Sequence, residues 1–250
     1  MRKNLHIRFF DTITSFLLVT KQNKKKKPVF HYSLIDAMRN NVFVGDLSVK
    51  DLRHKGNFGL GTYNYLDGEM IVLDGIFYRA VTNGDISEIK LECQVPYACV
   101  TFFSADIEHE IKEVKNIEML EEQILRRLPS INKPYALRIE CSFESIVLGC
   151  ISRIDPKKNI SFDQLLQNRS LYVKENISGT IVGFYNPPSF ASIDLSPFHF
   201  HFISDDKKYG GHLVSGNFSL VNLKVSIDEK PGYEIILPKQ SQEFDKLWLH

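Results

Sequence analysis

Residues 199–212 read HFHFISDDKKYGGH and hold three of the eight histidines in this chain of 250 residues. Side chains alternate along a β-strand, so His199 and His201 face the same way, about 6.5 Å apart along the backbone. The residues that follow, SDDKKYGG, favour a tight turn. A strand returning from that turn would begin at His212. The stretch therefore predicts a β-hairpin that gathers three imidazoles.

Three neutral imidazoles in this arrangement suit a zinc ion. The stretch supplies no fourth ligand, and an open fourth position is typical of catalytic zinc sites, where water or substrate binds. A second interpretation stays open from the spacing alone. In it, His199 and His201 lie on an exposed strand face, and His212 only closes a turn. The spacing does not identify a reaction.

A carboxylate is the next candidate. Glu69, in LDGEMIV, lies beside a glycine-rich turn, where the backbone can approach a ligand closely. The alternative is a solvated carboxylate at the end of a strand. The same region predicts a hairpin, because EMIVL and IFYRA flank Asp74 and Gly75, a strong signal for a two-residue turn.

The rest of the chain is rich in predicted strands, including a buried one at residues 97–103. Further strands are expected at ALRIECSF, SIVLGCIS, GTIVGFY, FHFHFIS, FSLVNLKVSI and YEIIL. Three helices are expected, each with a serine or asparagine that can cap it. They span residues 33–41, 116–128 and 161–168, with Ser33, Asn116 and Ser161 as caps. These elements do not alternate as β-α-β units, so they indicate an α+β fold.

Charge and cysteine content exclude some classes of protein. The chain has 31 basic and 30 acidic residues, so its formal charge of +1 gives no general attraction to nucleic acid or to an anionic membrane. The four cysteines form no Cys-x-x-Cys pair, and each lies in an apolar, strand-like run. Buried, reduced thiols are therefore expected, which favours a cytoplasmic location.

Residues 1–28 are interpreted as an N-terminal extension. MRKNLHIR is basic and FFDTITSFLLV is apolar, which imitates a signal peptide. Polar residues interrupt the apolar run, however, and no small-residue cleavage site follows it. No run in the chain reaches the ~20 apolar residues that a membrane span needs. The lysine run that ends at Pro28 marks the start of the folded part.

Five collinear segments resemble the α-acetolactate decarboxylase family. They are GNFGLGTYNYLDGEMIVLDGIFYR, PYACVTFFSADIEHEI, LPSINKPYALRIE, SGTIVGFYNP and HFHFISDDKKYGGH. The resemblance extends from about Phe30 to Phe244. It implies two mixed β-sheet domains with few helices: residues 29–132, and residues 133–250 with the zinc site. It also implies a homodimer.

The resemblance further implies a zinc enzyme that converts 2-acetolactate to (R)-acetoin and carbon dioxide without an organic cofactor. By this resemblance, His199, His201 and His212 match the zinc ligands of the family. Glu69 matches a glutamate beside the metal and is the expected catalytic proton donor, and Thr62 is expected to line the same pocket.

Two departures from the family pattern stand out. The family places an arginine in the pocket at the position of Gly149, so a guanidinium for the substrate carboxylate is missing there. Arg153 is expected to replace it in part, although it starts at least ~13 Å away along an extended strand. The family tail also brings a further glutamate to the site, and Glu243 does not match it. A decarboxylase-like zinc protein with another substrate, or without turnover, therefore stays an alternative.

Overall fold

Two β-sheets form the body of the protein in the computed structural model, which describes residues 26–155, 157, 160–219, 222–239 and 242–245. Residues 1–25, most of the expected N-terminal extension, lie outside the described part. The first sheet has seven strands among the described residues, and within them its only parallel pairing is between β1 and β15. Its order is β15 (Tyr233–Ile236), β1 (Val29–Tyr32), β8 (Tyr97–Thr101), β3 (Phe58–Thr62), β4 (Glu69–Leu73), β5 (Ile76–Ala80) and β6 (Ile86–Glu88).

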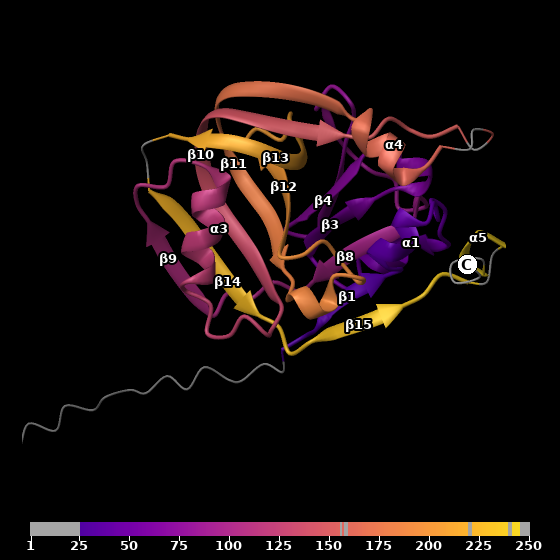
Figure 1. Cartoon of the computed structure of the whole chain (residues 1–250), viewed down its shortest axis with the longest axis horizontal. Coiled ribbons are helices and arrows are strands. Elements are labelled where there is room, and N and C mark those ends of the chain that lie inside the picture. Colours follow the sequence, from indigo (N-terminus) through magenta and orange to yellow (C-terminus); the bar gives the residue numbers. More distant parts are fainter. Residues whose placement is uncertain (1–25, 156, 158–159, 220–221, 240–241, 246–250) are drawn as a thin grey trace, which may run out of the picture.

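The second sheet has six strands, and all its pairings are antiparallel. Its order is β11 (Ser170–Tyr185), β12 (Phe198–Ser204), β13 (Gly210–Phe218), β10 (Tyr135–Cys150), β14 (Leu223–Glu229) and β9 (Ile107–Ile111). Because β10 also pairs with β11, the strands β10 to β13 close on themselves (Figure 1). The expected strand-rich α+β class is confirmed, and the mixed pairing occurs in the first sheet.

The two sheets exchange strands across the expected domain boundary at residue 132. Strand β9, from the N-terminal half, pairs with β14 in the second sheet. Strand β15, from the C-terminal half, pairs with β1 in the first sheet. The division into 29–132 and 133–250 stays a prediction. A small ribbon of β2 (Leu47–Ser48) and β7 (Gln94–Val95) completes the strands.

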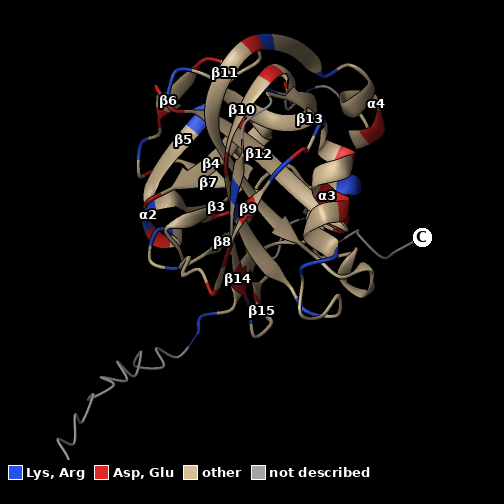
Figure 2. Ribbon diagram, turned by 90° about the vertical axis from the view of Figure 1, so that its left-hand side faces the viewer, with Lys and Arg blue, Asp and Glu red and all other residues tan. Residues whose placement is uncertain are grey.

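The helices are short and lie at the periphery. They are α1 (Ile35–Arg39), α2 (Val49–Leu52), α3 (Ile117–Leu125), α4 (Phe162–Gln167) and α5 (Gln242–Asp245), with two single-turn helices, η1 (Asn64–Leu66) and η2 (Pro188–Phe190). Asn116 caps α3 by accepting from the backbone of Met119, as expected. Ser161 caps α4 in a full capping box with Gln164. The red segments of α3 and α4 in Figure 2 are acidic residues of these helices, among them Glu118 and Asp163 in their first turns.

Two expectations about elements were wrong. Ser33 does not cap α1: it has a left-handed backbone with φ of 65°, and Leu34 occupies the cap position. ALRIECSF and SIVLGCIS are not separate strands but one strand, β10.

The hydrophobic core joins the two sheets. One cluster of buried residues draws on both: Phe58, Leu60 and Ile71 from the first, and Val182 and Phe184 from the second. Strands β3 and β4 thus face β11 and β12 directly, which fixes the distance between the sheets. No helix of the described residues is long and apolar enough to cross a membrane.

Candidate metal centre

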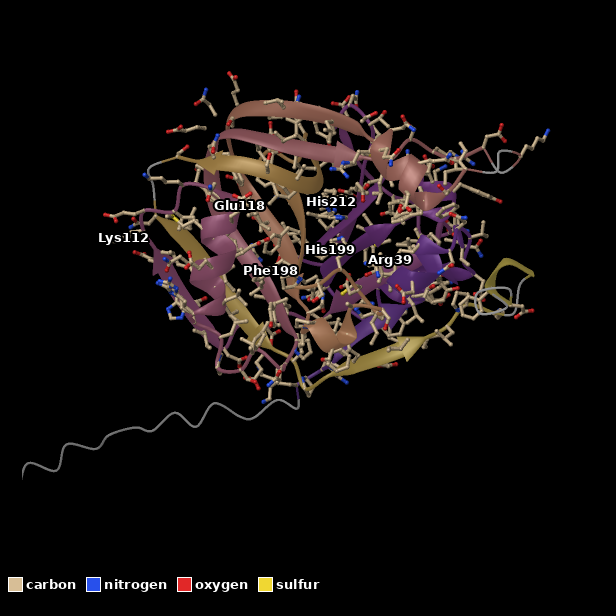
Figure 3. The ribbon with its side chains drawn as sticks, viewed as in Figure 1. Arg39, Lys112, Glu118, Phe198, His199 and His212 are labelled. Atoms are coloured by element: carbon tan, nitrogen blue, oxygen red, sulfur yellow. The ribbon has the colours of Figure 1, made fainter. Side chains whose placement is uncertain are left out.

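The three histidines meet between the sheets. His199 and His201 lie on the same face of β12, and His201 is directly opposite His212 on β13. One ring nitrogen of each lies within 4.8 Å of the others, and the ring centroids are 5.2 to 5.4 Å apart. Figure 3 shows His199 and His212 in the interior of the molecule. This geometry matches a common centre and excludes the exposed strand face.

The double glycine before His212 explains how β13 reaches this position. Tyr172, on β11, donates its hydroxyl hydrogen to the carbonyl of Gly210. A side-chain carbon on Gly211 would collide with that same hydroxyl group. Only glycine therefore lets β13 lie this close to Tyr172, which keeps His212 opposite His201.

Two of the imidazoles are oriented through Nδ1. His199 Nδ1 lies 2.8 Å from Asp194 Oδ1, and His201 Nδ1 lies 2.7 Å from the carbonyl oxygen of Met70. The carbonyl of Met70 accepts only, so His201 carries its hydrogen on Nδ1, and the Nε2 lone pair is left for a ligand. Such contacts fix the tautomer and the ring plane of metal-binding histidines.

Burial keeps two of the imidazoles neutral. Desolvation, and then the neighbouring His199, lowers the pKa of His212 to about 3 and places that of His201 well below its ordinary value. Metal ions bind neutral imidazole, so no proton has to leave these rings at neutral pH. Asp194 is ionised: burial would raise its pKa, but His199 and a hydrogen bond from Tyr97 hold the pKa below its usual range.

Glu69 and Thr62 reach the same place from the first sheet. Glu69 begins β4, and its Oε2 lies 3.5 Å from His201 Nε2. Burial raises the pKa of Glu69 to about 7, although a hydrogen bond from the backbone of Ile151 opposes the rise. Thr62 is paired with Glu69 across the strands, and its hydroxyl donates to the carbonyl of Gly68 at 2.8 Å. Thr62 thereby fixes the turn that leads into Glu69.

A cavity of about 260 Å³ opens in front of these groups. One end carries the histidines, Glu69 and Thr62, and most of the remaining wall is apolar. The other lining residues are Ile35, Met38, Gly61, Leu66, Tyr97, Gly149, Cys150, Ile151, Phe162, Leu166, Arg169 and Leu195. Because its polar groups converge at one end, the cavity suits a small ligand with an apolar part.

Arg153 and Glu243 were also named from the sequence. Arg153 is exposed and absent from the cavity lining, and its guanidinium lies 5.8 Å from the ring centre of Tyr65. Glu243 lies in α5, but its side chain is outside the described part of the structure. Two lining or supporting residues had no motif to reveal them: Asp194, in an irregular segment, and Arg169, at the end of α4.

A second group, His31, Cys99 and Asp194, also has its ligand atoms close together. His31 Nε2 is 3.6 Å from Asp194 Oδ2. Asp194, however, already accepts hydrogen bonds from Tyr97 and Asn186, in addition to the imidazole described above. Its lone pairs are occupied, so this group is better suited to support the histidine centre than to hold an ion.

The fold and the site together define a class: a strand-rich α+β protein in which three buried histidines and a carboxylate meet between two sheets. The profile of the alpha-acetolactate decarboxylase family matches residues 29–250. The alpha-acetolactate decarboxylase of Bacillus licheniformis is 30% identical over 227 residues, which cover 91% of this chain and 88% of that protein. That of Methanosarcina mazei is 33% identical over 192 residues, 77% of this chain and 66% of that protein.

Solved structures agree with these relatives. The acetolactate decarboxylase of Bacillus subtilis subspecies spizizenii superposes with a TM-score of 0.82 at 30% identity, covering 87% of this chain and 92% of that one. The chain therefore belongs to the alpha-acetolactate decarboxylase family. A Staphylococcus aureus protein of unknown function shares the fold, with a TM-score of 0.80 at 23% identity over 88% of this chain and 96% of that one.

Proposed function

We propose that this chain decarboxylates 2-acetolactate to (R)-acetoin and carbon dioxide, with a zinc ion held by His199, His201 and His212. The observation that carries the proposal is the meeting of three imidazoles and Glu69 at one end of one cavity. The identity of the substrate is inferred from membership of the family and from the names of its relatives.

The donor set fits zinc. Neutral imidazoles with an oriented ring are common zinc ligands, and three protein ligands are typical of catalytic rather than structural sites. A zinc ion bound there would act as a Lewis acid towards the oxygens of the substrate. The remaining steps belong to residues of this chain.

Glu69 is the proposed proton donor. When the bond between C2 and the carboxylate breaks, carbon dioxide leaves and the electron pair passes towards the ketone oxygen. One proton must then reach C2 to give acetoin. The protonated carboxyl of Glu69 can deliver it, and its fixed place at the start of β4 would direct the proton to one face. One-sided delivery accounts for a single product configuration.

The apolar wall supports this chemistry. Apolar residues such as Met38, Leu66 and Leu195 line the cavity, so its wall offers water few hydrogen-bond partners. In such surroundings, electrostatic interactions with developing charge are stronger than in water. Thr62 contributes by holding the turn before Glu69 and by lining the same wall.

The test is release of carbon dioxide and acetoin from racemic acetolactate, measured on protein of known zinc content with and without chelator. We expect turnover that is lost with chelator and restored by zinc. Bound zinc without turnover would instead support a related 2-hydroxy-3-oxo acid as substrate, or a non-catalytic role. Failure to bind zinc would contradict the assignment of the three histidines as its ligands.

We further propose that the chain acts as a homodimer in the cytoplasm. The resemblance to the family supports the dimer, and the cysteines support the location, because Cys93, Cys99, Cys141 and Cys150 are all free. Sedimentation equilibrium of the purified protein and fractionation of the source cells would test the two points separately.

A further inference from the structure

Arg169 joins α4 to β11 at the edge of the cavity. Its backbone N–H donates to the carbonyl of Leu166 at 3.4 Å, where α4 ends. Its side chain lines the cavity beside Leu166 and Phe162, two residues of the same helix. Arg169 is the one lysine or arginine among the described residues that line the cavity. The helix therefore places a single positive charge in a mostly apolar wall.

The charge of Arg169 acts on the carboxyl of Glu69, but no ion pair in the described part of the chain neutralises it. Its Nε is buried and makes no hydrogen bond, and no ion pair involves its guanidinium. Arg79 and Arg138 also have a buried Nε without a partner, but their charges are matched by Asp67 and Asp74 at 2.9 and 2.8 Å. A guanidinium in a cavity, with unused donors and no ion-paired carboxylate, is suited to bind an anionic ligand.

The charge also lies close to the proposed centre. Arg169 lines the same cavity as Glu69 and the three histidines, and its Cδ lies 3.5 Å from where Gly149, opposite His212, would carry a side-chain carbon. A ligand that touches the histidines can therefore reach the guanidinium as well.

Gly149 provides the space for this arginine. It lies on β10, opposite both His212 and Leu171 in the sheet. A side-chain carbon on Gly149 would lie 3.5 Å from Arg169 Cδ and 3.2 Å from Val214 Cγ2. The stem of Arg169 thus passes over the bare backbone of Gly149, and a long side chain at position 149 would compete with it for the same space.

We propose that Arg169 binds the carboxylate of the substrate. This assignment rests on the proposed function, and it takes the role that the sequence alone gave to Arg153. The planar guanidinium holds a carboxylate through two parallel hydrogen bonds, while the hydroxyl and ketone oxygens of the same acid face the histidine end. The ligand class is a short 2-hydroxy-3-oxo acid with small alkyl groups.

The first test compares Arg169→Gln and Arg169→Lys with Arg153→Gln, which makes the same change at an exposed arginine. Loss of a charged hydrogen-bond pair raises KM for acetolactate by about ten- to a hundredfold in Arg169→Gln. KM rises less in Arg169→Lys, because lysine keeps the positive charge but cannot form two parallel hydrogen bonds with a carboxylate. Zinc content stays at the wild-type value in all three. Equal KM values for Arg169→Gln and Arg153→Gln would overturn the assignment.

A binding measurement separates this assignment from the proposed function. Calorimetry on the zinc-loaded protein compares 2-hydroxy-2-methylbutanoate, which lacks the ketone needed for decarboxylation, with the neutral 2-methylbutane-1,2-diol. Wild type prefers the acid, and Arg169→Gln loses that preference. If this holds while acetolactate is not turned over, the proposed function fails and the assignment of Arg169 stands. If acetolactate is turned over and Arg169→Gln keeps the preference, the assignment fails alone.

A second arginine at position 149 gives an independent test. Gly149 has no positive φ, so the backbone accepts a side chain there. We expect Gly149→Arg to lower turnover in the wild-type background, because the two side chains compete for one space. The same change combined with Arg169→Gln raises turnover above that of Arg169→Gln alone. A gain from Gly149→Arg in the wild-type background would count against Arg169, since it would mean that the native carboxylate site lacks a cation.

Discussion

At the scale of single residues, the site is built from polar groups whose partners lie far away in sequence. Met70, on the first sheet, orients His201 on the second, and Asp194 orients His199 from an irregular segment. The His-x-His spacing indicates which side chains share a strand face. It does not reveal their partners, because strand pairing decides those. Sequence reasoning therefore found the three histidines and Glu69 but missed Asp194 and Arg169.

Replacing Glu69 by Gln tests the proposed proton donor. The amide keeps the shape of the side chain but has no acidic proton, so kcat should fall by about a hundred- to ten-thousandfold. Zinc content should change little, since Glu69 lies beside the histidines and is not one of the three proposed ligands. Product formation and bound zinc are measured together, with the exposed Glu118→Gln as control. Full turnover in Glu69→Gln would place the proton donor elsewhere.

Asp194 makes the stability of the metal-free protein depend on pH. Its folded pKa is lower than its unfolded pKa, because His199 and Tyr97 stabilise the carboxylate despite burial. The unfolded chain therefore binds a proton at Asp194 first as the pH falls. The stabilisation is fully present above the unfolded value of about 4, and it is lost progressively as the pH falls from there towards the lower folded pKa. Urea unfolding at pH 6 and pH 3.5 measures the loss.

The matched variant for that experiment is Asp194→Asn, which cannot titrate at this position. It should be less stable than wild type at pH 6, and its stability should fall less between the two pH values. The exposed Asp163→Asn serves as control and should follow wild type. Parallel pH profiles for wild type and Asp194→Asn would contradict the role given to this carboxylate.

At the scale of elements, the sequence predicted correctly those turns and helix caps whose interacting residues are close together in the chain. The Asp74–Gly75 turn, the Asn116 cap of α3 and the capping box of α4 involve residues within a few positions of each other. Ser33 does not cap α1 because it continues the sheet: its backbone N–H donates to the carbonyl of Ile236 in β15, and its left-handed φ differs from the extended backbone of a cap. β10 was divided in two because polar residues interrupt its apolar pattern, although they face outward.

The turn between β4 and β5 gives a test at this scale. Gly75 has a φ of 84°, and a side-chain carbon there would meet nothing closer than 3.9 Å. Backbone strain alone therefore determines the effect of a substitution. Gly75→Ala should lower the free energy of unfolding by about 1 kcal/mol. Gly75→Asn should cost less, because asparagine tolerates the left-handed region. Urea denaturation ranks them, and a larger loss for Asn would refute the explanation.

At the scale of the whole molecule, the site exists only where the two sheets face each other. Glu69 and Thr62 come from the first sheet, and the histidines come from the second. Their proximity could be predicted only through the family resemblance, since no local pattern specifies how two sheets pack. The shared hydrophobic cluster between the sheets fixes the position of Glu69 and Thr62 relative to the histidines.

This shared core predicts that the two halves do not fold independently. Residues 29–132 expressed alone would lack β15, and residues 133–250 alone would lack β9. Each would also expose its side of the common core. We expect neither fragment to show a cooperative urea transition, and the mixed fragments to regain zinc binding. A cooperative transition in either fragment alone would support two separately folding domains.

The parallel pairing of β1 with β15 has a consequence for the life of the chain. β1 is made early, whereas the strand that covers its second edge is synthesised near the end of the described chain. Until then, the backbone groups on that edge stay open to other polypeptides. Removal of β15 from the finished protein would reopen the same edge. An open strand edge of this kind is a site where other chains can pair and aggregate.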